Sequence, residues 1–314
     1  MKQNIAVIGA GVIGLTSAIR LLEQGFAVTL FARDIDANMA SRAAPALWIP
    51  YKASPEKLVL QWAARSLEIY HGFDAAAGIE KMPMLEYYHV DNGQPLWSKI
   101  LTDYRELTAA ELKSGYTKGY AAATYQIDTS LFVDHLLALF KQKGGALFQT
   151  TFERLQDVNA EFSVIVNCSG VWSHQLVPDA ASFPIRGQYL LLEKPAGLRN
   201  IIFATEDENN YTLIVPRQHD CYLGGTTLDH DWDTAIRPET SEKIRRRAEQ
   251  FEPSLVGMKI LHEGVGLRPG RETVRLTREL LSDGRAVIHN YGHGGSGFTV
   301  GWGCAEDVVR LVLS

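Results

Sequence analysis

The stretch Ile5-Ala6-Val7-Ile8-Gly9-Ala10-Gly11-Val12-Ile13-Gly14 predicts a buried strand, a tight glycine turn and the start of a helix. Gly9 permits the turn, and Gly11 lacks the Cβ atom that would obstruct a pyrophosphate. Gly14 lets the helix approach the strand closely. A turn of this kind between a strand and a helix is typical of dinucleotide binding.

The residues after this turn support the same interpretation. A helix is expected over residues 12–24 and a second strand over 27–32, which completes a βαβ unit. An acidic residue should lie about 20 positions beyond the turn to bind ribose hydroxyls, and Asp34 stands there. Arg33 beside it is either a solvated charge or a phosphate contact.

A second glycine-rich stretch, Val287-Ile288-His289-Asn290-Tyr291-Gly292-His293-Gly294-Gly295-Ser296-Gly297-Phe298-Thr299, lies near the other end of the chain. It follows a short apolar strand, expected over residues 286–288, and precedes a helix expected over 303–311. Glycines in this position let the backbone approach a flat or anionic ligand. Two such turns suggest one long ligand held at both ends, which favours FAD over NAD. Ser169 and Gly170, after a strand expected over 162–167, should give a third contact.

The composition of the 314-residue chain is that of a globular protein, and it argues against several partners. The net charge of -5 is mild and no basic block is present, so nucleic acid is not an expected partner. No run of about 18 apolar residues predicts a membrane helix. The first apolar stretch, 5–22, contains glycines and Arg20 and does not resemble a signal peptide. We expect a cytoplasmic protein, and both a monomer and a homodimer remain open.

Predicted helices and strands alternate at both ends of the chain and around residues 128–170, whereas the segments between are richer in antiparallel strands. The pattern predicts an α/β protein with a Rossmann-like FAD-binding domain and a substrate domain that has a mixed, largely antiparallel sheet. The FAD-binding domain is built from separated segments, expected at 1–50, 126–180 and 258–314, and the substrate domain from 51–125 and 181–257. Further helices are expected over 56–71, 109–113, 128–143 and 241–251. Further strands are expected over 85–90, 146–149, 188–193, 211–216, 221–224, 260–267 and 273–276.

Several polar residues bear on the chemistry. Arg268 follows an apolar strand and offers a rigid fork for a carboxylate, with a surface ion pair as the alternative. His289 and His293 lack a third ligand at suitable spacing, so we expect no metal site and assign them to hydrogen bonding in the glycine loop. The cysteines are far apart and are expected to be buried free thiols; they are Cys168, Cys221 and Cys304.

Motifs that span nearly the whole chain stand in the order found in one enzyme family. The chain resembles the D-amino-acid/D-aspartate oxidase family in Leu47-Trp48-Ile49-Pro50-Tyr51, Val166-Asn167-Cys168-Ser169-Gly170-Val171-Trp172, Arg186-Gly187-Gln188, Gly266-Leu267-Arg268-Pro269, Val274-Arg275-Leu276, Ile288-His289-Asn290-Tyr291-Gly292-His293-Gly294-Gly295 and Trp302-Gly303-Cys304-Ala305. The resemblance implies FAD as cofactor and oxidation of a D-amino acid to an imine, which hydrolyses to a 2-oxo acid and ammonia. It also implies molecular oxygen as electron acceptor and release of hydrogen peroxide.

The resemblance assigns roles to individual residues. Arg268 matches the arginine that binds the substrate carboxylate, and Gly295 matches the glycine whose carbonyl accepts a hydrogen bond from the substrate amine. Leu213 replaces the family's carboxylate-binding tyrosine, and we expect Tyr211, two residues earlier on the same strand face, to substitute for it. The substrate pocket is expected to include Ile49, Tyr51, Leu213 and Ser296. The cofactor is expected to contact Gly9, Gly11, Val12, Ile13, Gly14, Arg33, Asp34, Ser41, Phe152, Ser169, Gly170, Gly292, Gly294, Gly297, Phe298 and Thr299, the last three facing the flavin N1/C2=O edge.

The expected pocket residues are uncharged, which favours neutral D-amino acids over D-aspartate or D-glutamate unless Arg217 or His219 points inward. No histidine, aspartate or glutamate stands in a family position for a general base, so we expect hydride transfer from the substrate Cα to flavin N5. The short segment 203–210 leaves little room for a lid. The alternatives are a glycine- or sarcosine-type amine oxidase and, outside the enzymes, an FAD-binding redox sensor.

Overall fold

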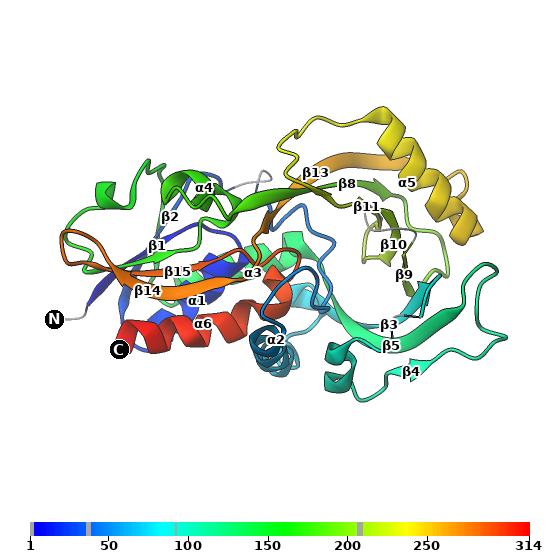
Figure 1. The fold of residues 1–314 in the computed structure, drawn as a ribbon, viewed down its shortest axis with the longest axis horizontal. Helices are drawn as coiled ribbons and strands as arrows, with labels where there is room; N and C mark the ends of the chain where they lie inside the picture. The colour runs from blue at the N-terminus through cyan, green and yellow to red at the C-terminus, as the bar shows by residue number, and fades with distance from the viewer. Residues whose placement is uncertain (1–2, 36–38, 92, 206–209) are drawn as a thin grey trace.

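The computed structural model describes residues 3–35, 39–91, 93–205 and 210–314. It contains two β-sheets that follow one another along the long axis of the molecule (Figure 1). Half of the segment 203–210, in which little room for a lid is predicted, lies outside the described residues, namely 206–209. Within the described ranges, no helix is both long enough and apolar enough to cross a membrane.

The first sheet has six strands in the order β14-β15-β7-β1-β2-β6, and every neighbouring pair is parallel except β14–β15. Its strands are β1 (Asn4–Ile8), β2 (Ala27–Ala32), β6 (Ala146–Gln149), β7 (Val164–Asn167), β14 (Arg275–Leu280) and β15 (Ala286–Tyr291). β1 and β7 are nearly continuous buried runs, as parallel strands covered on both faces require. Because β1 pairs with both β2 and β7, the carboxyl ends of these three strands meet at one edge.

Four long helices pack beside this sheet. They are α1 (Val12–Glu23), α2 (Glu56–Tyr70), α3 (Thr129–Gln142) and α6 (Gly297–Leu313). The helix α6 contacts both α1 and α2, and α1 also contacts α3, so the two ends of the chain share one core (Figure 1). Shorter helical turns are η1 (Ala75–Ala77), η2 (Leu96–Ile100), η3 (Leu155–Asp157), η4 (Gly170–Trp172), α4 (Ser173–Leu176) and η5 (Pro253–Leu255).

The second sheet has nine strands in the order β12-β8-β11-β10-β9-β3-β5-β4, with β13 also paired to β8. Its strands are β3 (Ile79–Tyr88), β4 (Arg105–Glu106), β5 (Lys118–Ile127), β8 (Phe183–Leu192), β9 (Ile201–Thr205), β10 (Asn210–Pro216), β11 (Cys221–Thr226), β12 (Leu228–Asp229) and β13 (Ile260–Gly270). All pairs are antiparallel except β3–β9. One helix, α5 (Pro238–Phe251), contacts β8, β10 and β11 and buries Ile244, Ala248 and Phe251 with them.

The predicted α/β fold, with a Rossmann-like sheet and a second, largely antiparallel sheet, is confirmed. Residues 109–113 were wrongly predicted to be helical: they form a turn, because the Glu111 carboxylate accepts hydrogen bonds from the backbone N–H and the hydroxyl of Thr108, both at 2.9 Å. The last helix begins at Gly297, six residues before the predicted start, because buried Phe298 and Val300 supply packing that outweighs the low helix propensity of glycine.

All strands of the six-stranded sheet come from the segments predicted to form the FAD-binding domain. One strand of those segments does not join this sheet: β13 pairs with β8 of the other sheet, from Ile260 opposite Leu192 to Gly270 opposite Phe183. We therefore propose that this domain boundary falls after β13 rather than at residue 258. The rest of the predicted division stays a prediction.

Replacement of Gly303 by alanine tests the close approach of α6 to α2. A Cβ atom there would lie 2.4 Å from the Trp62 Cα atom and 2.5 Å from its carbonyl oxygen. We expect Gly303→Ala to lower the free energy of unfolding by about 1–3 kcal/mol through overpacking. In the control, Gly301→Ala, the closest atom is the Thr16 hydroxyl oxygen at 3.4 Å, so the higher helix propensity of alanine should leave stability unchanged or raised. Urea unfolding compares the two variants, and equal stabilities would contradict the packing argument.

Candidate functional site

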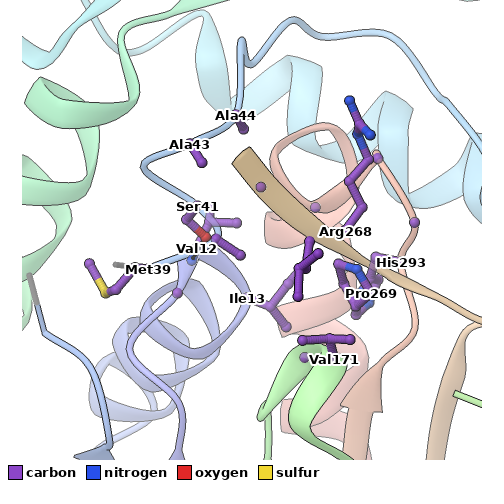
Figure 2. Close-up of a pocket in the computed structure, with 18 of the residues that line it drawn as sticks. Val12, Ile13, Met39, Ser41, Ala43, Ala44, Val171, Arg268, Pro269 and His293 are labelled. Carbon is purple, nitrogen blue, oxygen red and sulfur yellow. Dashed lines mark hydrogen bonds between the residues drawn. The ribbon is translucent and has the colours of Figure 1, made fainter. Parts of the chain in front are cut away.

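A cavity of about 700 Å³ is lined by residues of both sheets. One end is lined by the turn after β1 and by the ends of β2 and β7, and the other by the inner face of the nine-stranded sheet. Figure 2 shows Val12 and Ile13 at the start of α1, Ser41 on the neighbouring loop, and Arg268 on β13. The cavity therefore spans the distance between the glycine turn and the arginine predicted to bind a carboxylate.

The turn after β1 depends on glycines in close contact with backbone. Gly9 has a φ of 109°, and a Cβ atom on it would lie 2.3 Å from the carbonyl oxygen of Cys168. A Cβ on Gly14 would lie 1.8 Å from the carbonyl oxygen of Gly9. Gly11 is the N-cap of α1 and receives no side-chain cap, while the backbone N–H of Val12 donates to the Ser41 hydroxyl at 3.0 Å. The positive end of the α1 dipole thus opens into the cavity, as anion binding requires.

The neighbouring strand ends supply charged, small and aromatic side chains. Arg33 donates two hydrogen bonds to the Asp34 carboxylate, at 2.9 and 2.6 Å, and its guanidinium lies over the Trp172 ring at 3.9 Å from the centroid. These three residues line the cavity, as do Phe152, Ser169 and Gly170. The position of Asp34 at the end of β2 suits hydrogen bonds to ribose hydroxyls. Arg33 is not a free solvated charge, because its guanidinium pairs with the Asp34 carboxylate. A phosphate contact of Arg33 stays a prediction.

The second glycine loop joins β15 to α6 at the middle of the cavity. Gly292 and Gly294 have φ values of 84° and 54°. The backbone N–H of Gly294 donates to the carbonyl oxygen of Pro269 at 2.8 Å. The backbone N–H of Gly295 donates to the carbonyl oxygen of Tyr51 at 3.1 Å. Helix α6 then begins without a side-chain cap, and Gly297, at its start, lines the cavity. A second uncapped helix N-terminus therefore faces the same space.

The two histidines of this region lie in different surroundings. His289 is held by Asn167 at 3.2 Å and by the Glu279 carboxylate at 2.7 Å, and burial lowers its pKa. His293 lines the cavity, and burial lowers its pKa to about 3, so its imidazole is neutral. Its Nε2 atom is buried and has no hydrogen-bond partner among the described residues. A polar ligand in the cavity would give this atom a partner.

Arg268 meets Tyr211 at the sheet end of the cavity. The Arg268 Nη2 atom donates to the Tyr211 hydroxyl oxygen at 3.0 Å, and Nη1 donates to the carbonyl of Thr226 at 3.3 Å. The guanidinium lies over Gly187, where a Cβ atom would come within 2.4 Å of Nη1. Burial raises the pKa of Tyr211, which keeps its hydroxyl protonated. Because this oxygen accepts from Arg268, its hydrogen is free to donate to an anion beside the guanidinium.

Four predicted site residues do not line the cavity in the described structure: Gly14, Gly292, Ser296 and Thr299. Ser296, predicted to face the substrate, is fully buried behind Tyr51, whose backbone N–H and carbonyl it bonds at 2.7 and 2.9 Å. The Thr299 hydroxyl donates to the carbonyl of Ile49 at 2.9 Å. These hydroxyls hold the loop that carries Ile49 and Tyr51, both of which do line the cavity with Leu213.

The sequence analysis did not single out two charged residues that line the cavity, Glu153 and Glu86, of which Glu86 lies on β3. The expectation of uncharged pocket residues stays a prediction. For Glu86 the sequence held little information. The only signal was an acid within a run of apolar residues, and the strand was predicted to begin at residue 85 rather than at Ile79. Arg217 does not line the cavity in the described structure, because it forms two hydrogen bonds of 2.6 Å with the Asp220 carboxylate. His219 is exposed.

Comparisons with known proteins agree with this geometry. A family model described as FAD dependent oxidoreductase matches residues 4–311. A D-amino-acid oxidase of Rubrobacter xylanophilus is 40% identical over 308 residues, covering 97% of this chain and 94% of that protein. The human D-aspartate oxidase is 33% identical over 325 residues, covering 98% of this chain and 94% of that protein. A glycine oxidase from Bacillus cereus has a similar fold, with a TM-score of 0.83 at 18% identity over 99% of this chain and 97% of that one.

The fold and the cavity define a dinucleotide-binding protein whose two glycine turns line one cavity. The chain belongs to the FAD dependent oxidoreductase family, and FAD is its cofactor. The described residues fit this group: two uncapped helix N-termini open into the cavity, and the unpartnered Nε2 atom of His293 lies in it. Which of the lining residues contact FAD stays a prediction.

Replacement of Gly9 by alanine tests the cofactor turn. Gly9 and Gly25 both have a positive φ, of 109° and 85°, but only at Gly9 would a Cβ atom meet backbone, since nothing lies within 4 Å of one on Gly25. We expect Gly9→Ala to weaken FAD binding by about 100-fold because the turn must shift. Gly25→Ala should bind FAD as the wild type does. Titration of the apoproteins with FAD, followed by flavin fluorescence, measures both, and equal affinities would contradict this role of the turn.

Proposed function

We propose that the protein oxidises D-amino acids to imines, which hydrolyse to 2-oxo acids and ammonia, with release of hydrogen peroxide. The observation that carries the proposal is the Arg268–Tyr211 pair at the end of the cavity, beside the glycine loop. Full-length relatives named D-amino-acid oxidase, at 40% and 38% identity, support it.

The chain's residues act by binding and orienting the substrate. The Arg268 guanidinium and the Tyr211 hydroxyl hold the carboxylate, and the Gly295 carbonyl accepts a hydrogen bond from the amine. The glycine turns at Gly9 and Gly294 would hold FAD, which would supply the acceptor for a hydride from the substrate Cα and the route of the electrons to molecular oxygen. Because carboxylate and amine are fixed at two points, only the D-enantiomer directs its Cα–H bond toward the cofactor while its side chain enters the pocket.

The chain is not expected to supply a general base for this reaction. Neutral His293, with its pKa lowered to about 3, is a weak base. Glu86 lies on β3, in the wall that we assign to the substrate side chain rather than to Cα. Since we assign no base to Cα among the described residues, we expect the hydrogen to leave with its electron pair.

The side-chain pocket favours substrates that are not acidic. Ile49, Tyr51 and Leu213 line it, and the Glu86 carboxylate would repel the side chain of D-aspartate or D-glutamate.

A cytoplasmic location is part of the proposal, supported by three buried free cysteines, which fit a reducing compartment.

Hydrogen peroxide release by the purified holoenzyme tests the proposal. The panel contains neutral, basic and acidic D-amino acids, each L-enantiomer, glycine and N-methylglycine. We expect peroxide from non-acidic D-amino acids and none from the L-enantiomers. Peroxide from glycine or N-methylglycine alone would identify an amine oxidase of another type. No peroxide from any substrate, with FAD bound, would favour a redox sensor.

Substitution of Tyr211 tests whether it serves as the carboxylate-binding tyrosine. Tyr211→Phe removes the hydroxyl but keeps the ring, so we expect KM for a D-amino acid to rise about 10- to 100-fold, the equivalent of one hydrogen bond to a charged group. Arg268→Lys should lower kcat/KM further, because an ammonium cannot form the bidentate contact. Tyr125→Phe is the control, since Tyr125 does not line the cavity in the described structure. Steady-state peroxide assays measure KM and kcat/KM for each variant. An unchanged KM in Tyr211→Phe would exclude Tyr211 from carboxylate binding.

A further inference from the structure

Glu86 is a buried acid that the carboxylate- and amine-binding contacts do not use. It lies on β3, is 2% exposed, and lines the cavity. Its Oε2 atom accepts a hydrogen bond from the Tyr104 hydroxyl at 3.1 Å, and the Tyr88 hydroxyl bonds the same carboxyl. Two neutral donors thus hold the carboxyl group in place, and it forms no ion pair within the described residues.

The strand register places Glu86 on the same face of the sheet as the predicted substrate pocket. Glu86 is opposite Phe203 on β9, and Phe203 is opposite Leu213 on β10. Leu213 and Tyr211 are two residues apart and so share that face. Glu86 and Leu213 are separated by two strand spacings, or about 10 Å. A substrate whose carboxylate is held at Tyr211 and Arg268 therefore needs a long side chain to reach Glu86.

Aromatic rings cover the route between these two places. The Phe203 ring lies 5.7 Å from that of Tyr211 and 6.4 Å from that of Tyr88. All three residues line the cavity, and so does Trp97. Aromatic walls pack against the methylene groups of a long side chain and also attract a cation at its end.

Charged groups on the neighbouring elements do not neutralise Glu86. Lys118 of β5 pairs with Asp91 at 3.2 Å and with Glu106 at 2.7 Å, and Arg105 of β4 pairs with Glu111 at 2.7 Å. The other charged residues of β3 and η2 are exposed, namely Glu80, Lys81 and Lys99, and Lys81 pairs with exposed Asp103 at 3.7 Å. The described residues of β9 and β10 carry no charge. A buried carboxylate without a cation is costly, and a cationic ligand would offset that cost.

We propose that Glu86 is a specificity-determining residue that binds the cationic end of a basic D-amino acid side chain, such as that of D-lysine or D-arginine. The inference rests on the proposed function, because it takes the carboxylate position from Arg268 and Tyr211. The side chain follows the aromatic wall, and its ammonium or guanidinium donates to the Glu86 carboxylate. Neutral side chains of the same length enter the pocket but leave the carboxylate without a cationic partner.

Comparison of D-lysine with D-norleucine tests this role, because the two differ in the terminal ammonium group and are closely similar in length. For the wild-type holoenzyme, we expect kcat/KM to be about 10- to 100-fold higher for D-lysine, as for a charge-assisted hydrogen bond. Glu86→Gln keeps the shape and should remove this preference while retaining oxidation of D-norleucine. Glu80→Gln, an exposed substitution on the same strand, should leave the preference unchanged.

The outcomes separate this inference from the proposed function. No oxidation of either substrate by the wild-type enzyme would overturn the proposed function and, with it, the inference. Oxidation of both with equal kcat/KM, or an unchanged preference in Glu86→Gln, would overturn only the inference. An equal loss for both substrates in Glu86→Gln, at unchanged FAD content, would show that Glu86 only supports the pocket structure.

The pH dependence of the wild-type preference gives a second readout that needs no variant. Burial raises the pKa of Glu86 to about 7, against the opposing hydrogen bonds of Tyr104 and Tyr88. The carboxyl is therefore charged above about pH 7 and neutral below it. We expect the D-lysine to D-norleucine ratio of kcat/KM to fall as the pH is lowered from about 8 to about 6. A ratio independent of pH over this range would contradict the inference.

Discussion

The antiparallel pairing of β8 with β13 is the constraint on which the arrangement of the site depends. The two strands pair over the whole length of β13, and the chain then continues into β14 of the other sheet. A hydrogen-bonded ladder leaves little freedom along its length, so Arg268 keeps a fixed position relative to the glycine turns. Gly187 on β8 completes the arrangement, because any side chain there would occupy the space of the Arg268 guanidinium. The distance between the glycine turns and Arg268 is therefore set by backbone pairing and not by a loop.

The N-termini of two helices give the cavity positive electrostatic potential at two fixed positions. Helices α1 and α6 both begin at the cavity, after Gly11 and Ser296, and neither has a side-chain cap in the described structure. Each contributes roughly half a positive charge and, apart from the Val12 N–H that donates to Ser41, first-turn N–H groups without an intrahelical partner. These groups suit anionic or strongly polar parts of a ligand at two separate positions. We propose that one FAD molecule spans both positions, which would account for two glycine turns at opposite ends of the sequence in one fold.

Much of this site could be predicted from the sequence because its signals are local. The turn at Gly9 and Gly11 and the acid at Asp34 follow from spacing within one βαβ unit, and Tyr211 follows from the two-residue repeat of a strand. Glu86 could not be found in this way, because alternation along β3 does not say which face borders the cavity. That face is set by the pairing of β3 with β9, between residues more than 100 positions apart in the sequence. The position of Ser296 could not be predicted for a related reason. A serine in a glycine loop can face the ligand or the protein, and here its hydroxyl bonds the backbone of Tyr51.

Two residues of opposite charge, Arg268 and Glu86, line the end of the cavity at the nine-stranded sheet. Arg268 lies at one end and Glu86 lies across the sheet from it, with uncharged aromatic rings between them. In a space from which water is largely excluded, such a pair acts on the orientation of any molecule that carries charges of both signs. An amino acid bound in reverse would place its carboxylate beside Glu86 and leave Arg268 without an anion, and both contacts would be unfavourable. With the roles that we propose for Arg268 and Glu86, the same two residues would also exclude the reversed substrate, which could not present its Cα–H bond to the cofactor.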